Sequence, residues 1–129
     1  MNRKWSPGIN HIEFWVANLE ESLSFYDTLF EIIGWYKLNR VSYSTGSTEI
    51  YLKEVDETIK KTVGPRHICF QATSKEMVDQ VGEFLRQVNA RIIRGPVFRN
   101  EYSEGYYTID FYDPNGYILE VAYTPNMKL

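Results

Sequence analysis

The chain has few of the residues that form disulfides or bind metal ions in small proteins: its 129 residues include one cysteine and two histidines. With Cys69 alone, no disulfide can form within the chain, which agrees with a reducing compartment. No apolar run approaches the roughly 20 residues of a membrane-spanning helix, and no charged-then-apolar leader opens the chain. We therefore expect a soluble cytoplasmic protein that does not enter a membrane.

An excess of positive charge is also missing. The chain carries 14 Lys and Arg against 17 Asp and Glu, a formal net charge of −3, and its pI is about 5.4. The basic residues are scattered, so no basic patch marks a nucleic-acid surface, and we expect no nucleic-acid partner. Hydrophobic residues make up 43% of the chain and aromatic residues 16%, which is enough for one packed domain of this length.

The first half of the chain predicts one strand, one helix and a meander of short strands. Residues 1–8 are polar and form a predicted tail. Residues 9–16 alternate as a strand, and a capping pair of Asn18 and Glu21 opens a helix that Gly34 ends. From residue 35 to residue 55 the sequence alternates again and predicts short strands. Residues 9–55 are therefore expected to form one module.

The same order returns after a polar linker at residues 56–65. Residues 66–72 predict a strand, Thr73 with Glu76 predicts a second helix start, and the helix is expected to end near Asn89. Three strands follow, at residues 91–98, 106–112 and 117–123, before a short tail at 125–129. Residues 66–124 therefore predict a second module of the same kind.

Individual residues match between the two halves. His11-Ile12-Glu13-Phe14 and His67-Ile68-Cys69-Phe70 coincide at an offset of 67 − 11 = 56, and internal duplication explains this most simply. The predicted fold class is α+β: two βαβββ modules in tandem, with the helices outside.

A tight turn near the C-terminus leads to a carboxylate in an apolar strand. Asp113-Pro114-Asn115-Gly116 predicts a hairpin turn. In the strand that follows, Glu120 points away from the side shared by Leu119 and Val121. A solvated edge position would explain Glu120 equally well, because glutamate is seldom buried without a partner.

Two histidines and two carboxylates fall at corresponding places in the two modules. The aliphatic neighbours of each histidine must face the helix, so both imidazoles are expected to point away from it. The same reasoning applies to the carboxylates of the two final strands. The predicted metal ligands are His11, Glu49, His67 and Glu120.

Nitrogen and oxygen ligands suit one divalent ion such as zinc, nickel, cobalt, manganese or ferrous iron. A lone strand histidine is more often a satisfied, half-buried side chain, and a one-residue slip would reverse the face of Glu49. Four neighbours share the expected faces, and we predict that they contact substrate: Glu13, Trp15, Tyr51 and Gln71.

These motifs resemble the vicinal oxygen chelate superfamily, which comprises the glyoxalase, bleomycin-resistance and ring-cleaving dioxygenase group. The resemblance covers about residues 8–124 and rests on His11-Ile12, Ser22 to Tyr26, His67-Ile68-x-Phe70 and the turn leading to Glu120. It implies paired βαβββ modules whose curved mixed sheets, with the helices outside, enclose a metal ion in a cleft inside. It also implies a homodimer, in some members with ligands from two subunits around one ion.

The ligand order His, Glu, His, Glu is similar to bacterial-type glyoxalase I. That resemblance implies a metal-dependent lyase or isomerase acting on a small oxygenated metabolite through a metal-stabilised enediolate, with Glu120 as the catalytic base. The sequence departs from the pattern at Trp15, where an arginine that holds glutathione is expected, and at Glu13, where fosfomycin-resistance transferases carry threonine. A protein that sequesters a small aromatic or drug-like molecule in the cleft is the alternative.

Overall fold

The structure is a computed structural model that describes residues 7–56 and 67–128. Most of the predicted tail at residues 1–8 and of the predicted linker at 56–65 lies outside these residues. The first module contains β1 (His11–Val16), α1 (Leu19–Ile33), β2 (Tyr36–Asn39), β3 (Ser42–Ser44) and β4 (Glu49–Glu54). The second contains β5 (Ile68–Gln71), α2 (Lys75–Gln87), β6 (Ile92–Phe98), β7 (Tyr107–Tyr112) and β8 (Ile118–Tyr123).

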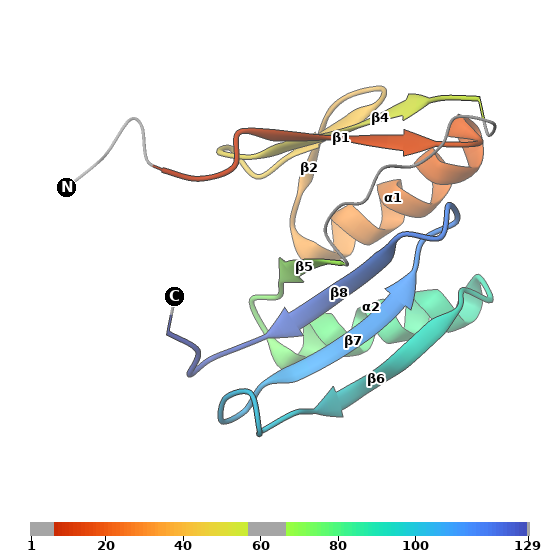
Figure 1. The fold of residues 1–129 in the computed structure, drawn as a ribbon. Coiled ribbons are helices and arrows are strands. Elements are labelled where there is room, and N and C mark those ends of the chain that lie inside the picture. Colours follow the sequence, from red (N-terminus) through yellow and green to blue (C-terminus); the bar gives the residue numbers. More distant parts are fainter. Residues whose placement is uncertain (1–6, 57–66, 129) are drawn as a thin grey trace.

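The two modules have the same strand topology. The first sheet has the order β1-β4-β3-β2 and the second the order β5-β8-β7-β6, so the first strand of each module pairs with its last. That pair is parallel in both modules, and the other pairs are antiparallel. The duplicated βαβββ prediction is therefore confirmed, and the two sheets are separate four-stranded sheets (Figure 1).

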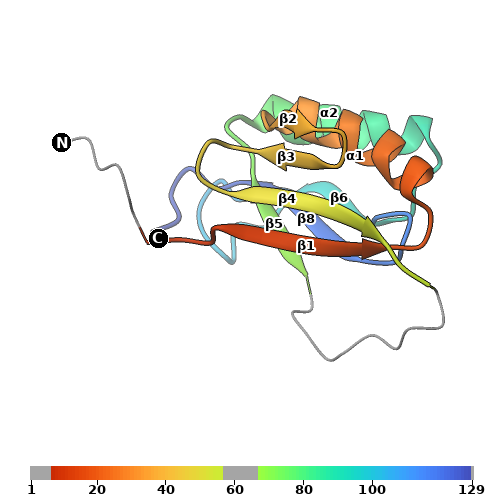
Figure 2. The same ribbon diagram turned by 90° about the horizontal axis from the view of Figure 1, so that it is seen from above.

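Both helices lie on one side of the sheets (Figure 2). α1 begins where predicted: the Asn18 side chain accepts a hydrogen bond from the Glu21 N–H, and Gly34 ends the helix with φ of 90°. The prediction for α2 was one residue early. Ser74, not Thr73, accepts the hydrogen bond from the Met77 N–H, because adjacent hydroxyl residues are both able to cap and the backbone selects one.

One hydrophobic core joins the modules beneath the helices. α1 packs against α2, and aromatic rings cross the boundary: Phe30 meets Phe70 edge-on at 5.5 Å, and Phe25 lies 5.5 Å from Phe84. Phe30 is fully buried. The helix-facing residues of the strands enter this core, as their alternation predicts, and the opposite sheet faces are left for polar groups.

A buried hydrogen bond also ties the first module to the second. The Tyr26 hydroxyl on α1 donates to Asp113 Oδ2 at 2.6 Å. Asp113 opens the turn between β7 and β8, and its Oδ1 accepts from the backbone N–H groups of Asn115 and Tyr117, both at 2.8 Å. Burial, followed by the neighbouring Asp113 carboxylate, raises the pKa of Tyr26. The predicted hairpin turn therefore also fixes the position of α1.

Candidate functional site

Glu120 lies on the helix-free face of β8, in the interior of the second sheet. It is only 5% exposed, and β8 is flanked by β5 and β7. A solvated edge position is therefore excluded. A buried carboxylate must have hydrogen-bond partners, and Glu120 has three.

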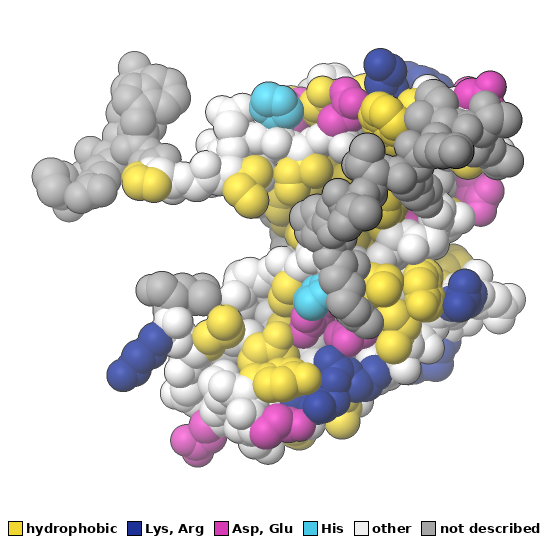
Figure 3. Space-filling model, in the orientation of Figure 1, with side chains coloured by type: hydrophobic (Ala, Val, Ile, Leu, Met, Phe, Trp, Pro, Cys, Tyr) yellow, Lys and Arg dark blue, Asp and Glu magenta, His cyan; other side chains and the backbone are white. Residues whose placement is uncertain are grey.

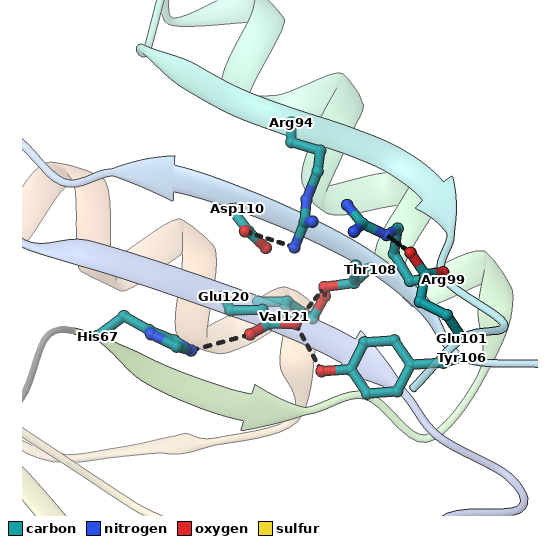
Figure 4. A network of polar contacts seen from close by, with 9 residues as sticks. All are labelled: His67, Arg94, Arg99, Glu101, Tyr106, Thr108, Asp110, Glu120 and Val121. Atoms are coloured by element: carbon teal, nitrogen blue, oxygen red, sulfur yellow. Dashed lines mark hydrogen bonds and ion pairs between the residues drawn. The ribbon is translucent and has the colours of Figure 1, made fainter. Parts of the chain in front are cut away.

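Each oxygen of Glu120 has its own contacts (Figure 4). Oε2 accepts hydrogen bonds from the Tyr106 hydroxyl at 2.7 Å and from the Thr108 hydroxyl at 2.6 Å. Oε1 lies 3.1 Å from His67 Nε2. Because the two hydroxyl groups occupy Oε2, Oε1 is the oxygen presented to His67 and to any ligand.

The hydrogen bonds also affect the donor. Burial and then the hydrogen bond to the Glu120 carboxylate raise the pKa of Tyr106, so its hydroxyl keeps its proton. Thr108 is fully buried. His67, in contrast, has a side chain that is 40% exposed. The site therefore combines a carboxylate fixed from within the sheet with an imidazole open to solvent.

A row of polar residues crosses the second sheet from strand to strand. Cys69, Glu120, Asp110 and Arg94 are successive Cα partners on β5, β8, β7 and β6. Burial, followed by the Glu120 charge, raises the pKa of Asp110, and Arg94 opposes this effect through a 2.8 Å ion pair. The face is visible in Figure 3, where charged and hydrophobic side chains lie together over the second sheet.

Cys69 is a thiol in this row. Although the residue is exposed, the protein atoms around its sulfur, followed by the carboxylates of Glu120 and Asp110, raise its pKa to about 12. A thiolate is the form that binds metals or attacks electrophiles. Cys69 is therefore a neutral neighbour of the site at physiological pH.

The corresponding face of the first module is open. His11 and Glu49 are Cα partners on β1 and β4, so they share the face that the alternation predicted. The predicted alignment of Glu49 with Glu120 is wrong by two residues, because Tyr51 pairs with Glu13 as Glu120 pairs with Cys69. His11 Nδ1 lies 2.8 Å from Asn10 Oδ1. When Nδ1 donates to that oxygen, the lone pair of Nε2 remains available.

Glu13 organises the rest of this face. Its carboxylate accepts a hydrogen bond from Trp15 Nε1 at 2.6 Å and another from the Tyr51 hydroxyl at 2.8 Å, and these two bonds lower its pKa. Three predicted substrate contacts thus form one network. The fourth, Gln71, donates to the backbone oxygens of Ala72 and Ala122, and this bridge between β5 and β8 occupies its amide hydrogens.

The four predicted metal ligands form two pairs, one in each module. Within the described part of the chain, no three His, Cys, Asp or Glu side chains are grouped so that they could hold an ion. The donor types still fit a divalent ion, since each pair offers one imidazole nitrogen and one carboxylate oxygen. A site with all four ligands would require the sheet face that carries His11 and Glu49 to meet the sheet face that carries His67 and Glu120.

Two residues of the Glu120 environment, Thr108 and Asp110, did not emerge from the sequence. The signal for them was the turn itself: the hairpin pairs Tyr112 with Ile118 and therefore Asp110 with Glu120. Counting outward from the predicted turn in steps of two gives Asp110 and then Thr108 on the Glu120 face.

Comparison with known proteins agrees with this architecture. The model of the family described as "Glyoxalase/Bleomycin resistance protein/Dioxygenase superfamily" matches residues 8–121. The chain belongs to this superfamily.

Individual members of the superfamily are distant relatives. The chain is 28% identical over 123 residues to virulence protein STM3117 of Salmonella typhimurium, covering 88% of this chain and 82% of that protein. A glyoxalase/bleomycin resistance protein from Albidiferax ferrireducens superposes with a TM-score of 0.73 at 21% identity, covering 89% of this chain and 98% of the other. A glyoxalase/dioxygenase from Nostoc punctiforme gives 0.71 at 20% identity, covering 98% and 99%. At these identities the structural likeness establishes the fold.

Among the described residues, neither helix has the length and apolar character that crossing a membrane requires.

Proposed function

We propose that this protein is a metal-dependent lyase or isomerase of glyoxalase type that moves a proton between adjacent carbons of a small oxygenated metabolite. The observation that carries this proposal is the setting of Glu120: a carboxylate buried in a central strand, with one oxygen held by two hydroxyl groups and the other facing an imidazole. A general base needs a fixed position as well as access to its proton.

The chain's own residues supply that fixed position. Tyr106 and Thr108 hold Oε2, so Oε1 is the atom that accepts a proton from a substrate carbon and returns it. The side chains around Glu120 leave it only 5% exposed, and this exclusion of water strengthens the interactions of its carboxylate with any bound charge. His67 stands at the open side of the site and contacts the same oxygen.

A divalent ion fits the proposed ligands in donor chemistry. His11, Glu49, His67 and Glu120 would hold it, and when bound it would act as a Lewis acid that polarises a substrate carbonyl. Within one chain, among the residues described, no hydrogen bond or ion pair joins the His11–Glu49 pair to the His67–Glu120 pair. We therefore propose a homodimer in which the first module of one chain faces the second module of its partner.

Substrate would enter between these faces. The Glu13, Trp15 and Tyr51 network is already ordered by its own hydrogen bonds, so it provides a polar and aromatic wall opposite Glu120 in the proposed dimer. Sequestering of an aromatic molecule on the same wall is the second candidate function, and the exposure of Trp15, at 39%, favours it.

Metal uptake tests the proposal and separates these two functions. Purified protein should bind about one divalent ion per site, as measured by elemental analysis after incubation with nickel, zinc, cobalt or manganese. His67→Ala should abolish uptake, and Glu120→Gln should weaken it and abolish turnover in a screen of 2-oxoaldehydes and their thiol adducts. Protein that stays metal-free in excess of all four ions would overturn the enzyme proposal and favour sequestering.

The dimer has its own test. Light scattering should give a particle of twice the 15.2 kDa chain mass. An equimolar mixture of His11→Ala and Glu120→Gln chains should recover metal binding at one site in a mixed dimer, since one of its two shared sites would be intact. A particle of single-chain mass that binds a full complement of metal would contradict the shared site.

A further inference from the structure

A second concave surface lies away from the proposed metal ligands, where α1, α2 and the turn between β7 and β8 meet. It is a groove of about 700 Å³, a volume within the range of small-molecule sites. None of the residues proposed above to hold metal or contact substrate lines it. The helices that form its walls lie on one side of the sheets (Figure 2), whereas Glu120 faces the helix-free side of β8 with Asp110 and Thr108.

Aromatic rings give the groove an apolar wall. Phe25 on α1 and Phe84 on α2 both line it, and their ring centroids are 5.5 Å apart. Each ring is mostly buried in the core, so its position is fixed before any ligand arrives. Tyr112, at the end of β7, adds a third ring. Planar apolar ligands bind well to fixed aromatic surfaces of this kind.

Arg91 gives the groove a cation that has no carboxylate partner. Its guanidinium lies 4.2 Å from the centroid of the Tyr112 ring, which holds the charged group against an aromatic face. Arg94 and Arg99 form ion pairs with Asp110 and Glu101. Among the described residues, no carboxylate lies within ion-pair distance of Arg91. A guanidinium held against an aromatic ring and left without a carboxylate partner is suited to bidentate binding of a carboxylate.

Two hydroxyl groups on α1 line the groove as well. Ser24 and Thr28 are four residues apart, so they lie one above the other on the same helix face. Both residues are exposed, and in the described part of the chain neither side chain makes a hydrogen bond. The carboxylate of Glu21, one turn earlier, can accept a hydrogen bond from a ligand hydroxyl or amine.

We propose that this groove is a second small-molecule site, which binds a planar aromatic carboxylate. The ring would lie along Phe25 and Phe84, the carboxylate would pair with Arg91, and polar ring substituents would reach Ser24 and Thr28. A ligand with a ring hydroxyl or amine satisfies Glu21 too, so hydroxybenzoates and aminobenzoates fit better than benzoate. The site is independent of the metal chemistry proposed for Glu120.

The test is a titration of the ¹⁵N-labelled full chain with 4-hydroxybenzoate, followed by amide shifts in NMR spectra. For a ligand of this size we expect a Kd on the order of 1 mM, with saturable shifts at Ser24, Thr28, Arg91 and Gly116. 4-Hydroxybenzamide, which has the same shape without the charge, should bind about tenfold more weakly. Arg91→Met should cost a similar factor.

Matched variants distinguish binding in the groove from binding elsewhere on the chain. Arg86→Met removes an exposed arginine in the last turn of α2 that does not line the groove, and it should leave the Kd unchanged. Glu120→Gln should also leave it unchanged, which keeps this test separate from the enzyme proposal. Thr28→Trp should fill the groove and abolish binding while circular dichroism stays that of the wild type.

Three results would overturn the proposal: no saturable shifts, shifts confined to the faces carrying Glu13 and Glu120, or an Arg91→Met chain that binds as tightly as wild type.

Discussion

The helix-free faces of the two modules each carry one histidine and one carboxylate, and they differ in where that carboxylate lies on the last strand and in how it is held. Glu120 is buried and receives two hydroxyl hydrogen bonds and an imidazole contact. Glu49 lies two residues earlier along its strand, because Tyr51 is the Cα partner of Glu13 as Glu120 is of Cys69. Glu49 is half-buried, and among the described residues no side chain forms a hydrogen bond with it. Duplication preserved the positions of the histidines and the sheet face that carries each carboxylate, but neither the position of the carboxylate along its strand nor its surroundings.

The third strand of each module explains the difference. β3 has three residues, whereas β7 has six and is continued by Tyr106. The longer strand places Thr108 and Asp110 beside β8, with Tyr106 just before it, and Gly95 allows β6 to approach closely from the other side. Gly95 has φ of 102°, and a Cβ there would lie 2.9 Å from the Ile109 Cα. A site inside a sheet therefore depends on the length of neighbouring strands.

The largest predicted effect concerns the turns that precede the two carboxylate strands. Asp113→Ala should lower the free energy of unfolding by about 3 kcal/mol, because it leaves the buried Tyr26 hydroxyl and two turn N–H groups without their acceptor. In the first module the Thr45 hydroxyl contacts the exposed N–H groups of Ser47 and Thr48 and the exposed Ser47 hydroxyl. Water can replace these contacts, so Thr45→Ala should cost about 0.5 kcal/mol. Urea denaturation measures the free energy of unfolding of both variants, and equal losses would contradict the predicted difference between the two turns.

Removal of one hydroxyl beside Glu120 should have the next largest effect. Thr108→Val keeps the shape of the side chain but removes a donor to a buried carboxylate, and we expect a loss of about 2 kcal/mol. The matched change on the first face, Tyr51→Phe, removes a donor to the exposed Glu13. In thermal unfolding, the melting temperature of Tyr51→Phe should be close to that of wild type. A larger decrease for Tyr51→Phe than for Thr108→Val would contradict the prediction.

A third prediction concerns the pKa of Asp110, which burial and then Glu120 raise. In Glu120→Gln the neighbouring charge is gone, so the pKa of Asp110 should fall toward its ordinary value while remaining above it, because burial persists. A ¹³C NMR titration of the carboxyl groups measures this shift. An unchanged or higher pKa would show that Glu120 does not act on Asp110.

The same raised pKa has a consequence for stability. A carboxyl group with a folded-state pKa above its unfolded value contributes stability at low pH, and that contribution is lost as the pH rises through the folded value. Glu120→Gln should reduce this loss. Urea denaturation of wild type and variant at pH 3 and at pH 7 tests whether the loss of unfolding free energy with rising pH is smaller in the variant.

The smallest effect is expected at Glu13. Its pKa is lowered by the hydrogen bonds from Trp15 and Tyr51, so its contribution to stability is present above the unfolded pKa and is lost as the pH falls through the folded value. The melting temperature of Glu13→Gln should lie slightly below that of wild type at pH 7, and the two should converge at pH 3. A gap that widens on acidification would contradict this assignment.

Alternation along the strands predicted most of the site faces correctly. The aliphatic partners of His11 and His67 do face the helices, and the His11–Glu49 pairing places Glu49 on the expected side. Hairpin geometry carries further information, since the turn at Asp113 also determines which residues oppose Glu120. These features are local, so the sequence determines them within a few residues.

The burial of Glu120 could not be predicted in the same way. It depends on Tyr106, which lies just before β7 and contacts the carboxylate across the β7–β8 hairpin from 14 residues away, and on the position of β8 between two strands. The start of α2 shows a smaller limit, because Thr73 and Ser74 are both good caps and tertiary contacts decide between them. Contacts between two chains are harder still to predict from the sequence of one, and the shared metal site stays a prediction.

The hydrogen bond from Tyr26 to Asp113 has a consequence for how the molecule folds. The internal duplication suggests that each half could fold independently. This hydrogen bond, however, joins residues 87 positions apart and is buried. The aromatic rings of the common core are buried as well. Neither half can satisfy those groups without the other. The two halves should therefore melt together, as one calorimetric transition with equal calorimetric and van't Hoff enthalpies, and a fragment corresponding to either half should lack fixed structure when expressed by itself.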